Sequence, residues 1–141
     1  MWRGGNMEIQ LINEELIEAL RSQAKKSERL RKNYDMRTSA EDTSQRMLNV
    51  LEPGTKVPIH RHTDTTETTV CLKGCLDIIF YEELPNMDSG GPGREFKEFF
   101  RTELCPDKGN HGIQIPLGVW HTVNVKEPSC IFEAKDGKYG E

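Results

Sequence analysis

The spacing of apolar residues changes character along the chain, from helical spacing near the N-terminus to short strand-like runs farther on. Leu16, Ile17, Leu20 and Ala24 recur at the 3.6-residue period of an amphipathic helix. We therefore predict one helix over residues 12–27, with its apolar stripe packed against the outside of a domain.

The residues at the two ends of this segment also favour a helix. Asn13 is a good N-cap residue, and the acidic pair Glu14 and Glu15 follows it in the first turn. Lys25 and Lys26 stand in the last turn, where cations complement the helix dipole. Nothing in this helix carries chemistry.

From residue 46 onward, short runs of strand-forming residues alternate with Gly- and Pro-rich turns. Many short strands without crossover helices predict an all-β sandwich or barrel. The expected strands are 46–51, 56–62, 67–73, 76–82, 94–104, 112–115, 121–125 and 129–135. The polar stretch 28–46 is expected to be a surface connection, and 84–94 an exposed loop. The organisation is then a tail or short strand (1–11), a helix with its connection (12–45), and a barrel (46–141).

Length and charge exclude several classes of protein. The chain has 141 residues, of which 35% are hydrophobic, and a net charge of −4. A slightly acidic chain argues against a nucleic-acid partner, and the lack of a long apolar run argues against a membrane-spanning helix. No secretory signal opens the sequence, so we expect a cytoplasmic protein. The four cysteines are expected to be reduced thiols, at positions 71, 75, 105 and 130.

The strongest chemical signal is a pair of histidines two residues apart, followed by a glutamate. Residues two apart on a strand face the same side, so His60 and His62 point together and Arg61 points away. Glu67 opens the next strand and can point to the same side. His121 follows a Pro-x-Gly turn and can supply a fourth ligand. Imidazole and carboxylate ligands of this kind suit one divalent transition metal, Zn²⁺, Fe²⁺, Mn²⁺ or Ni²⁺.

These residues resemble the motifs of the cupin superfamily. The first cupin motif, G(X)5HXH(X)3–4E(X)6G, is matched at every position by residues 54–74. In the second, G(X)5PXG(X)2H(X)3N, Pro116, Gly118 and His121 match, the leading glycine is absent at its spacing, and Asn124 comes one residue early. The resemblance implies a single cupin jelly-roll barrel holding a metal, with the N-terminal α-helix packed outside.

A narrower resemblance covers most of residues 13–139. The segments 29–34, 44–54, 58–62 and 132–139 look like those of the WbuC-type cupin fold metalloproteins, which occur with bacterial surface-polysaccharide gene clusters. Lys138 stands where that family commonly has proline. The resemblance implies the cupin fold and a bound metal more strongly than it implies any particular activity.

Other polar residues are candidates for the pocket around the metal. Thr69 and Cys71 share the strand parity of Glu67 and are expected to face the barrel lumen, and Gln45, Arg46 and Asn33 are further pocket candidates. Glu133 lies in an apolar strand, either paired with Lys135 at the rim or turned inward as a general base. The candidate catalytic residues are Glu133, Arg46 and Tyr139.

Three functions remain open at this point. The chain is a metal-dependent isomerase, epimerase or lyase acting on a sugar or nucleotide-sugar, an Fe(II) dioxygenase, or a non-catalytic cupin that binds a small molecule. Trp120, on the face opposite His121, is expected in the core or an interface, with sugar stacking as an alternative, and His111 is expected in solvent. The partner is a small-molecule ligand, and monomer and homodimer are both open.

Overall fold

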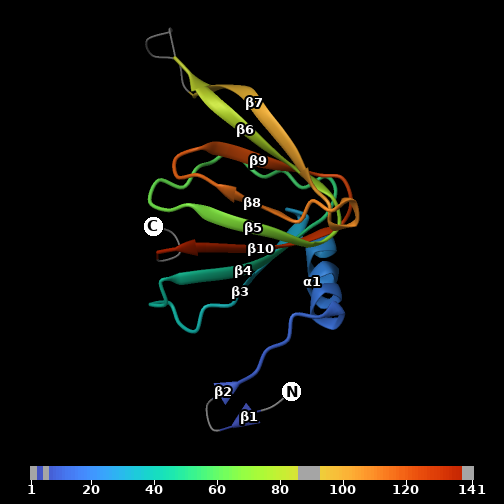
Figure 1. The fold of residues 1–141 in the computed structure, drawn as a ribbon. Helices are drawn as coiled ribbons and strands as arrows, with labels where there is room; N and C mark the ends of the chain where they lie inside the picture. The colour runs from blue at the N-terminus through green and yellow to red at the C-terminus, as the bar shows by residue number, and fades with distance from the viewer. Residues whose placement is uncertain (1–2, 5–6, 86–92, 138–141) are drawn as a thin grey trace.

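A computed structural model describes residues 3–4, 7–85 and 93–137 of the chain. Two antiparallel sheets, of five and three strands, form the body, and one helix covers the outer side of the larger sheet (Figure 1). The larger sheet has the order β3-β4-β10-β5-β8 and the smaller one β7-β6-β9. Their strands are β3 (Arg31–Asp35), β4 (Ser44–Leu51), β5 (Glu67–Lys73), β6 (Leu76–Leu84), β7 (Glu95–Leu104), β8 (Gly112–Ile115), β9 (Trp120–Val125) and β10 (Ser129–Asp136). This is the predicted all-β jelly roll.

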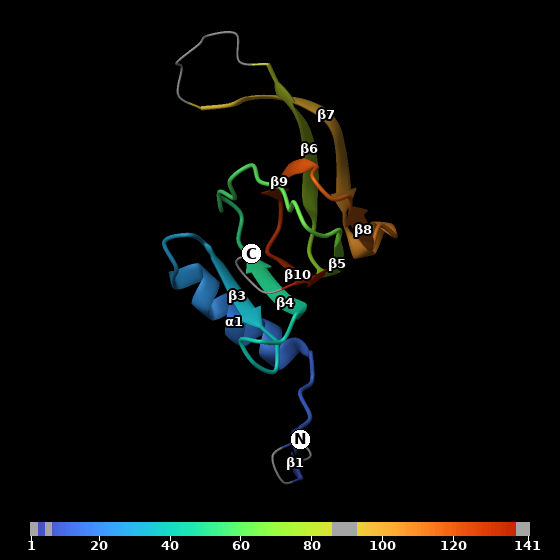
Figure 2. The ribbon, with the colours of Figure 1, turned by 90° about the vertical axis from the view of Figure 1, so that its left-hand side faces the viewer.

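The helix forms where the apolar spacing predicts it. Helix α1 spans Glu14–Lys26, and the Asn13 side chain accepts a 3.0 Å hydrogen bond from the Leu16 N–H. Ile17, Leu20 and Ala24 are buried. Figure 2 shows α1 lying along β3 and β4, on the side of the larger sheet that faces away from the smaller one.

Two expected segments differ from the structure. The polar stretch 28–46 contains strand β3, which is the edge strand of the larger sheet and pairs only with β4. An edge strand with one paired side needs little apolar character, so its polar sequence concealed it. Residues 56–62 form no regular strand; only His60 makes an isolated bridge, to His121. Pro58 has no N–H to donate, which interrupts any ladder there.

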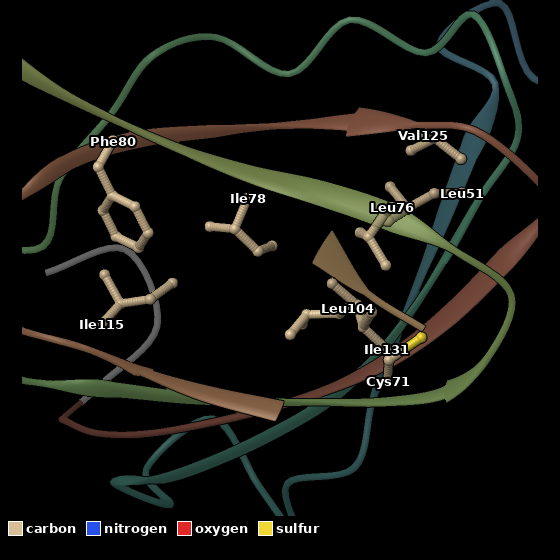
Figure 3. Packing of buried hydrophobic residues seen from close by; sticks show 9 residues of the cluster. All are labelled: Leu51, Cys71, Leu76, Ile78, Phe80, Leu104, Ile115, Val125 and Ile131. Atoms are coloured by element: carbon tan, nitrogen blue, oxygen red, sulfur yellow. The ribbon is translucent and has the colours of Figure 1, made fainter. Parts of the chain in front are cut away.

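The principal core lies between the two sheets. Its side chains come from the inner faces of both, as Figure 3 shows. They are Leu51, Cys71, Leu76, Ile78, Phe80, Leu104, Ile115, Val125 and Ile131. Cys71 therefore faces the lumen, as expected. A second cluster lies under α1, where Leu48, Val50 and Cys130 meet the helix.

The cysteines correct one expectation. Cys71 and Cys130 are free and buried, but Cys75 and Cys105 form a disulfide. The β6–β7 register sets Leu76 opposite Leu104, so the residues just outside this pair also meet, with their Cα atoms 4.4 Å apart. That proximity arises from strand pairing over 30 residues of sequence, which cysteine spacing does not reveal.

Near the N-terminus, two very short strands pair with each other, β1 (Arg3–Gly4) and β2 (Met7–Glu8), and they lie away from both sheets (Figure 1). None of the described helical residues makes a segment long and apolar enough to span a membrane.

Candidate metal centre

His60 and His121 are fixed side by side by their own backbones. The His60 N–H donates to the His121 carbonyl at 3.0 Å, and the His121 N–H donates back to the His60 carbonyl at 2.8 Å. Strand β9 also pairs with β6, which sets His121 opposite Phe80. Residues directly opposite in an antiparallel pair project to the same face. The two imidazole centroids accordingly lie 4.3 Å apart.

Hydrogen bonds to backbone carbonyls orient both rings. His60 Nδ1 lies 2.9 Å from the Pro58 carbonyl oxygen, and His121 Nδ1 lies 2.9 Å from that of Val119. A carbonyl only accepts, so Nδ1 carries the proton in both rings, and Nε2 presents its lone pair. This is the tautomer that a metal-ligating histidine needs, with the other ring nitrogen anchored to a carbonyl.

His62 is brought to the same place by the turn that precedes β9. The Gly118 N–H donates to the His62 carbonyl at 2.8 Å, which ties the two cupin-like motifs together. Gly118 has a φ of +82°, which favours glycine at this position. Glu67 begins β5 and lies beside the three histidines: one of its oxygens lies 3.5 Å from His62 Nε2 and the other 3.8 Å from His121 Nε2.

The donor set fits a transition metal. One ring nitrogen from each of His60, His62 and His121 lies within 4.8 Å of the others, so the three imidazoles could hold a metal ion. In the described part of the chain, Nε2 of His62 and of His121 are buried without a hydrogen-bond partner. Buried polar atoms without partners are rare in native proteins, and a metal would satisfy both.

The electrostatics of the site keep the ligands ready for a cation. Burial lowers the pKa of His60, and it lowers the pKa of His121 to about 4, so both rings are neutral at physiological pH. Burial opposes ionisation of Glu67, but the adjacent His62 and Lys135 outweigh it and lower its pKa to about 2. Two neutral imidazoles and an ionised carboxylate are the protonation states that metal binding requires.

Beneath these ligands the lumen contains a small cavity of about 40 Å³. Its polar lining consists of His60, Glu67, Thr69, His121, Asn49 and Glu133, and apolar core residues form the rest. Burial and the charge of Glu67 raise the pKa of Glu133 to about 7. The buried Oδ1 of Asn49 has no hydrogen-bond partner among the described residues. The cavity has room for a few water-sized groups and not for a whole sugar ring.

The pocket residues expected from strand parity lie on the lumen side. Thr69 is 2% exposed, and its hydroxyl lies 3.4 Å from a Glu67 oxygen. Of the two alternatives for Glu133, the structure favours the inward one, because it lines the cavity. Gln45 is buried, and its side-chain amide donates to the Gly137 carbonyl at 2.8 Å.

Two other candidates lie elsewhere, and one cannot be placed. Arg46 shares the face of Leu48, toward α1, and pairs with Asp42 at 3.0 Å. Strand alternation sends neighbours to opposite faces, so Arg46 points away from the cavity. Asn33 sits opposite Asn49 across the β3–β4 pair, but it is exposed at the sheet edge. Tyr139 lies outside the described residues.

Sequence reasoning missed the part that Lys135 plays. Its ammonium lies 3.5 Å from a Glu67 oxygen, so its ion pair is with the candidate metal ligand. Lys135 stands two residues after Glu133 on β10, and this parity was the available signal. Trp120 is half-buried on the opposite face of β9, with the Arg61 guanidinium 4.5 Å from its ring centroid, and His111 is exposed as expected.

Comparisons with solved structures show the same fold at low sequence identity. The chain superposes on SPY1581 of Streptococcus pyogenes, a conserved protein of unknown function, with a TM-score of 0.58 and 10% identity, covering 99% of this chain and 98% of that one. CapF of Staphylococcus aureus, a capsular polysaccharide assembling protein, superposes with a TM-score of 0.54 and 17% identity. The match covers 76% of this chain and 27% of CapF. Oxalate oxidase in complex with glycolate superposes with a TM-score of 0.55 and 17% identity, and the match covers 79% of this chain and 53% of the oxidase.

The chain thus spans about a quarter of CapF and about half of oxalate oxidase. No curated protein matches the sequence. The solved structures establish a cupin fold, and a family model described as a domain of unknown function, DUF6016, matches residues 12–89. The chain therefore has the cupin fold and belongs to the DUF6016 family.

Proposed function

We propose that this protein is a WbuC-type cupin that holds one divalent transition metal through His60, His62, Glu67 and His121, and acts on a sugar or nucleotide-sugar of bacterial surface-polysaccharide assembly. The observation that carries the metal site is the pair of buried Nε2 atoms, on His62 and His121, that have no partner among the described residues. Zinc, iron, manganese and nickel all suit this ligand set.

When bound, the metal would supply Lewis-acid polarisation of a carbonyl or hydroxyl oxygen of the ligand. The protein contributes the rest. Glu133 lines the cavity below the ligands, and its raised pKa, about 7, suits a group that takes up and returns a proton near neutral pH. The apolar walls of the cavity exclude bulk water. Because the cavity is only about 40 Å³, the reacting end of the ligand would enter it while the remainder stays outside.

Two lines of support favour a sugar-derived ligand. The sequence resembles a family found with surface-polysaccharide gene clusters. The fold is similar to that of CapF, a capsular polysaccharide assembling protein. Because the likeness to CapF is a likeness of fold at 17% identity, the sugar assignment depends on a binding measurement.

The test starts with metal content. Elemental analysis of natively purified protein should give close to one transition metal per chain. His121→Ala should lose it, whereas the control His111→Ala, at an exposed histidine just before β8, should keep it. Metal-loaded protein is then screened by calorimetry against sugars and sugar nucleotides. If the wild type contains no metal, the proposed metal site is wrong. If it contains metal but binds no sugar or sugar nucleotide, the proposed ligand is wrong.

An Fe(II) dioxygenase is a second candidate, supported by the small size of the cavity and by the fold similarity to oxalate oxidase. Anaerobic iron loading followed by oxygen-uptake measurements with small diols and hydroxy acids separates the two enzymes. Uptake that depends on substrate would favour the dioxygenase. A non-catalytic cupin would bind its ligand, and lose it on chelation, without turning it over.

A further inference from the structure

Lys135 lies at the edge of the metal centre, and its cationic side chain is not one of the proposed metal ligands. Its Nζ lies 3.5 Å from the Glu67 oxygen that also faces His62. It projects from β10 on the same side as Glu133, two residues closer to the C-terminal end of the strand. Its side chain is only 18% exposed, so the charge is held beside the site instead of extending into solvent.

Exposure indicates the side from which a ligand approaches. The side chains of His121 and Glu67 are 3% and 5% exposed, whereas those of His62 and Lys135 are 23% and 18% exposed. His60 is also half-exposed, so solvent reaches the metal centre on the side of His60, His62 and Lys135. A ligand that approaches the metal from this side comes near the Lys135 ammonium.

The charges at this entrance do not balance once a metal is present. A divalent metal with three neutral imidazoles and one carboxylate is a net cation, and Lys135 adds a further positive charge. Ionisation of Glu133 would not cancel the excess. Two cations that share one carboxylate, partly shielded from water, attract an anion more strongly than they would in bulk solvent.

We propose that Lys135 binds an oxyanion group of the ligand, a carboxylate or a phosphate, at the open side of the metal centre. This inference rests on the proposed metal site and narrows its ligand to an anionic one. Ammonium groups bind carboxylate and phosphate through charge-assisted hydrogen bonds, which are about twice as strong as neutral ones. The competing explanation is that Lys135 only neutralises Glu67, in which case it makes no contact with the ligand.

The test compares three variants in metal-loaded protein. Lys135→Met removes the charge, and Lys135→Arg keeps it. Lys73→Met is the matched control, because Lys73 lies on β5 at the other end from Glu67 and pairs with Glu14 on α1. Cobalt titration followed by visible absorption measures metal affinity. Calorimetry with acetate and with inorganic phosphate measures anion affinity, and the stronger-bound anion identifies the group.

We expect the affinity for the preferred anion to fall at least about tenfold in Lys135→Met, which corresponds to about 1.4 kcal/mol. It should stay within about threefold of wild type in Lys135→Arg and in Lys73→Met. Cobalt affinity should not fall in Lys135→Met, because removing a neighbouring cation favours the metal.

The outcomes separate the two proposals. If the wild type binds no cobalt, the proposed metal site fails and this inference fails with it. If it binds cobalt but neither anion, or if Lys135→Met binds the anion as tightly as wild type, the inference alone is overturned. Should Lys135→Met not fold, Lys135→Gln keeps a polar, uncharged side chain and tests the loss of the same charge.

Discussion

The two faces of the larger sheet are built from the same strands and differ sharply in chemistry. On the face under α1, β4 and β10 present Leu48, Val50 and Cys130, which pack against apolar helix residues. On the lumen face, the alternate residues of the same strands include Asn49 and Glu133 beside the cavity. A shift of one residue along a strand thus separates an ordinary core from a candidate site.

The difference between the two faces shows where this fold tolerates the burial of polar side chains. Burying an amide or carboxyl without a full set of partners costs free energy, and an apolar residue of similar size would avoid the cost. Under α1, the buried cluster is composed of apolar side chains. On the lumen face, one small cavity contains both the Oδ1 of Asn49, which has no partner among the described residues, and Glu133 with its raised pKa. A binding role for that cavity accounts for the contrast.

The largest expected effect is on the lumen side. A transition metal added at about a thousand times its dissociation constant should raise the free energy of unfolding by about 4 kcal/mol, because it binds only the folded site. Thermal melts with and without metal measure this shift. His60→Ala should abolish it, and Leu48→Ala, on the other face, should keep it. An equal shift in His60→Ala would place the metal elsewhere.

The next effect tests the face under the helix. Leu48 is fully buried, so Leu48→Ala should lower the free energy of unfolding by about 3 kcal/mol through lost burial and a cavity. Denaturant unfolding measures it. The control is Leu72→Ala on β5, where the side chain is 41% exposed and the loss should stay below about 1 kcal/mol. Similar losses in both variants would mean that packing under α1 does not dominate stability.

Glu133→Gln tests the cost of the half-buried Glu133 carboxyl through pH. The pKa of Glu133 is about 7 in the folded protein against an ordinary value of 4.5, so between these values the folded state holds a proton that the unfolded chain releases. Stability of metal-free wild type should therefore fall, relative to Glu133→Gln, as pH rises from 4.5 to 7, by about 2.5 kcal/mol. Unfolding curves at pH 5 and pH 8 give the difference. Parallel pH profiles would show that Glu133 ionises freely.

The smallest effect is expected at Arg46, on the face opposite the cavity. Arg46→Met removes an ion pair with Asp42 at the protein surface and should cost less than about 1 kcal/mol. Metal and anion affinities should remain within twofold of wild type, in contrast to Lys135→Met. A large loss of anion binding in Arg46→Met would contradict the assignment of these two cations to different faces.

Local sequence patterns predicted much of this protein. The helical period of α1 and its Asn13 cap were readable from neighbouring residues, as were the strands whose apolar runs fill the core. Strand β3 was not, because its polar residues are stabilised by pairing with β4 and not by burial. Strand parity likewise predicted the inward direction of Thr69 and Cys71, since alternation is a local property of extended chain.

The sequence by itself determined a small all-β domain with an outer helix and named His60, His62, Glu67 and His121 as the candidate ligands. Only the tertiary structure decided how distant strands meet. Strand pairing joined Cys75 to Cys105, turned Arg46 toward the helix side, and set Lys135 beside Glu67. The disulfide and the Lys135–Glu67 ion pair join residues 30 and 68 positions apart, and such long-range register is specified by the packed core as a whole and not by any local pattern.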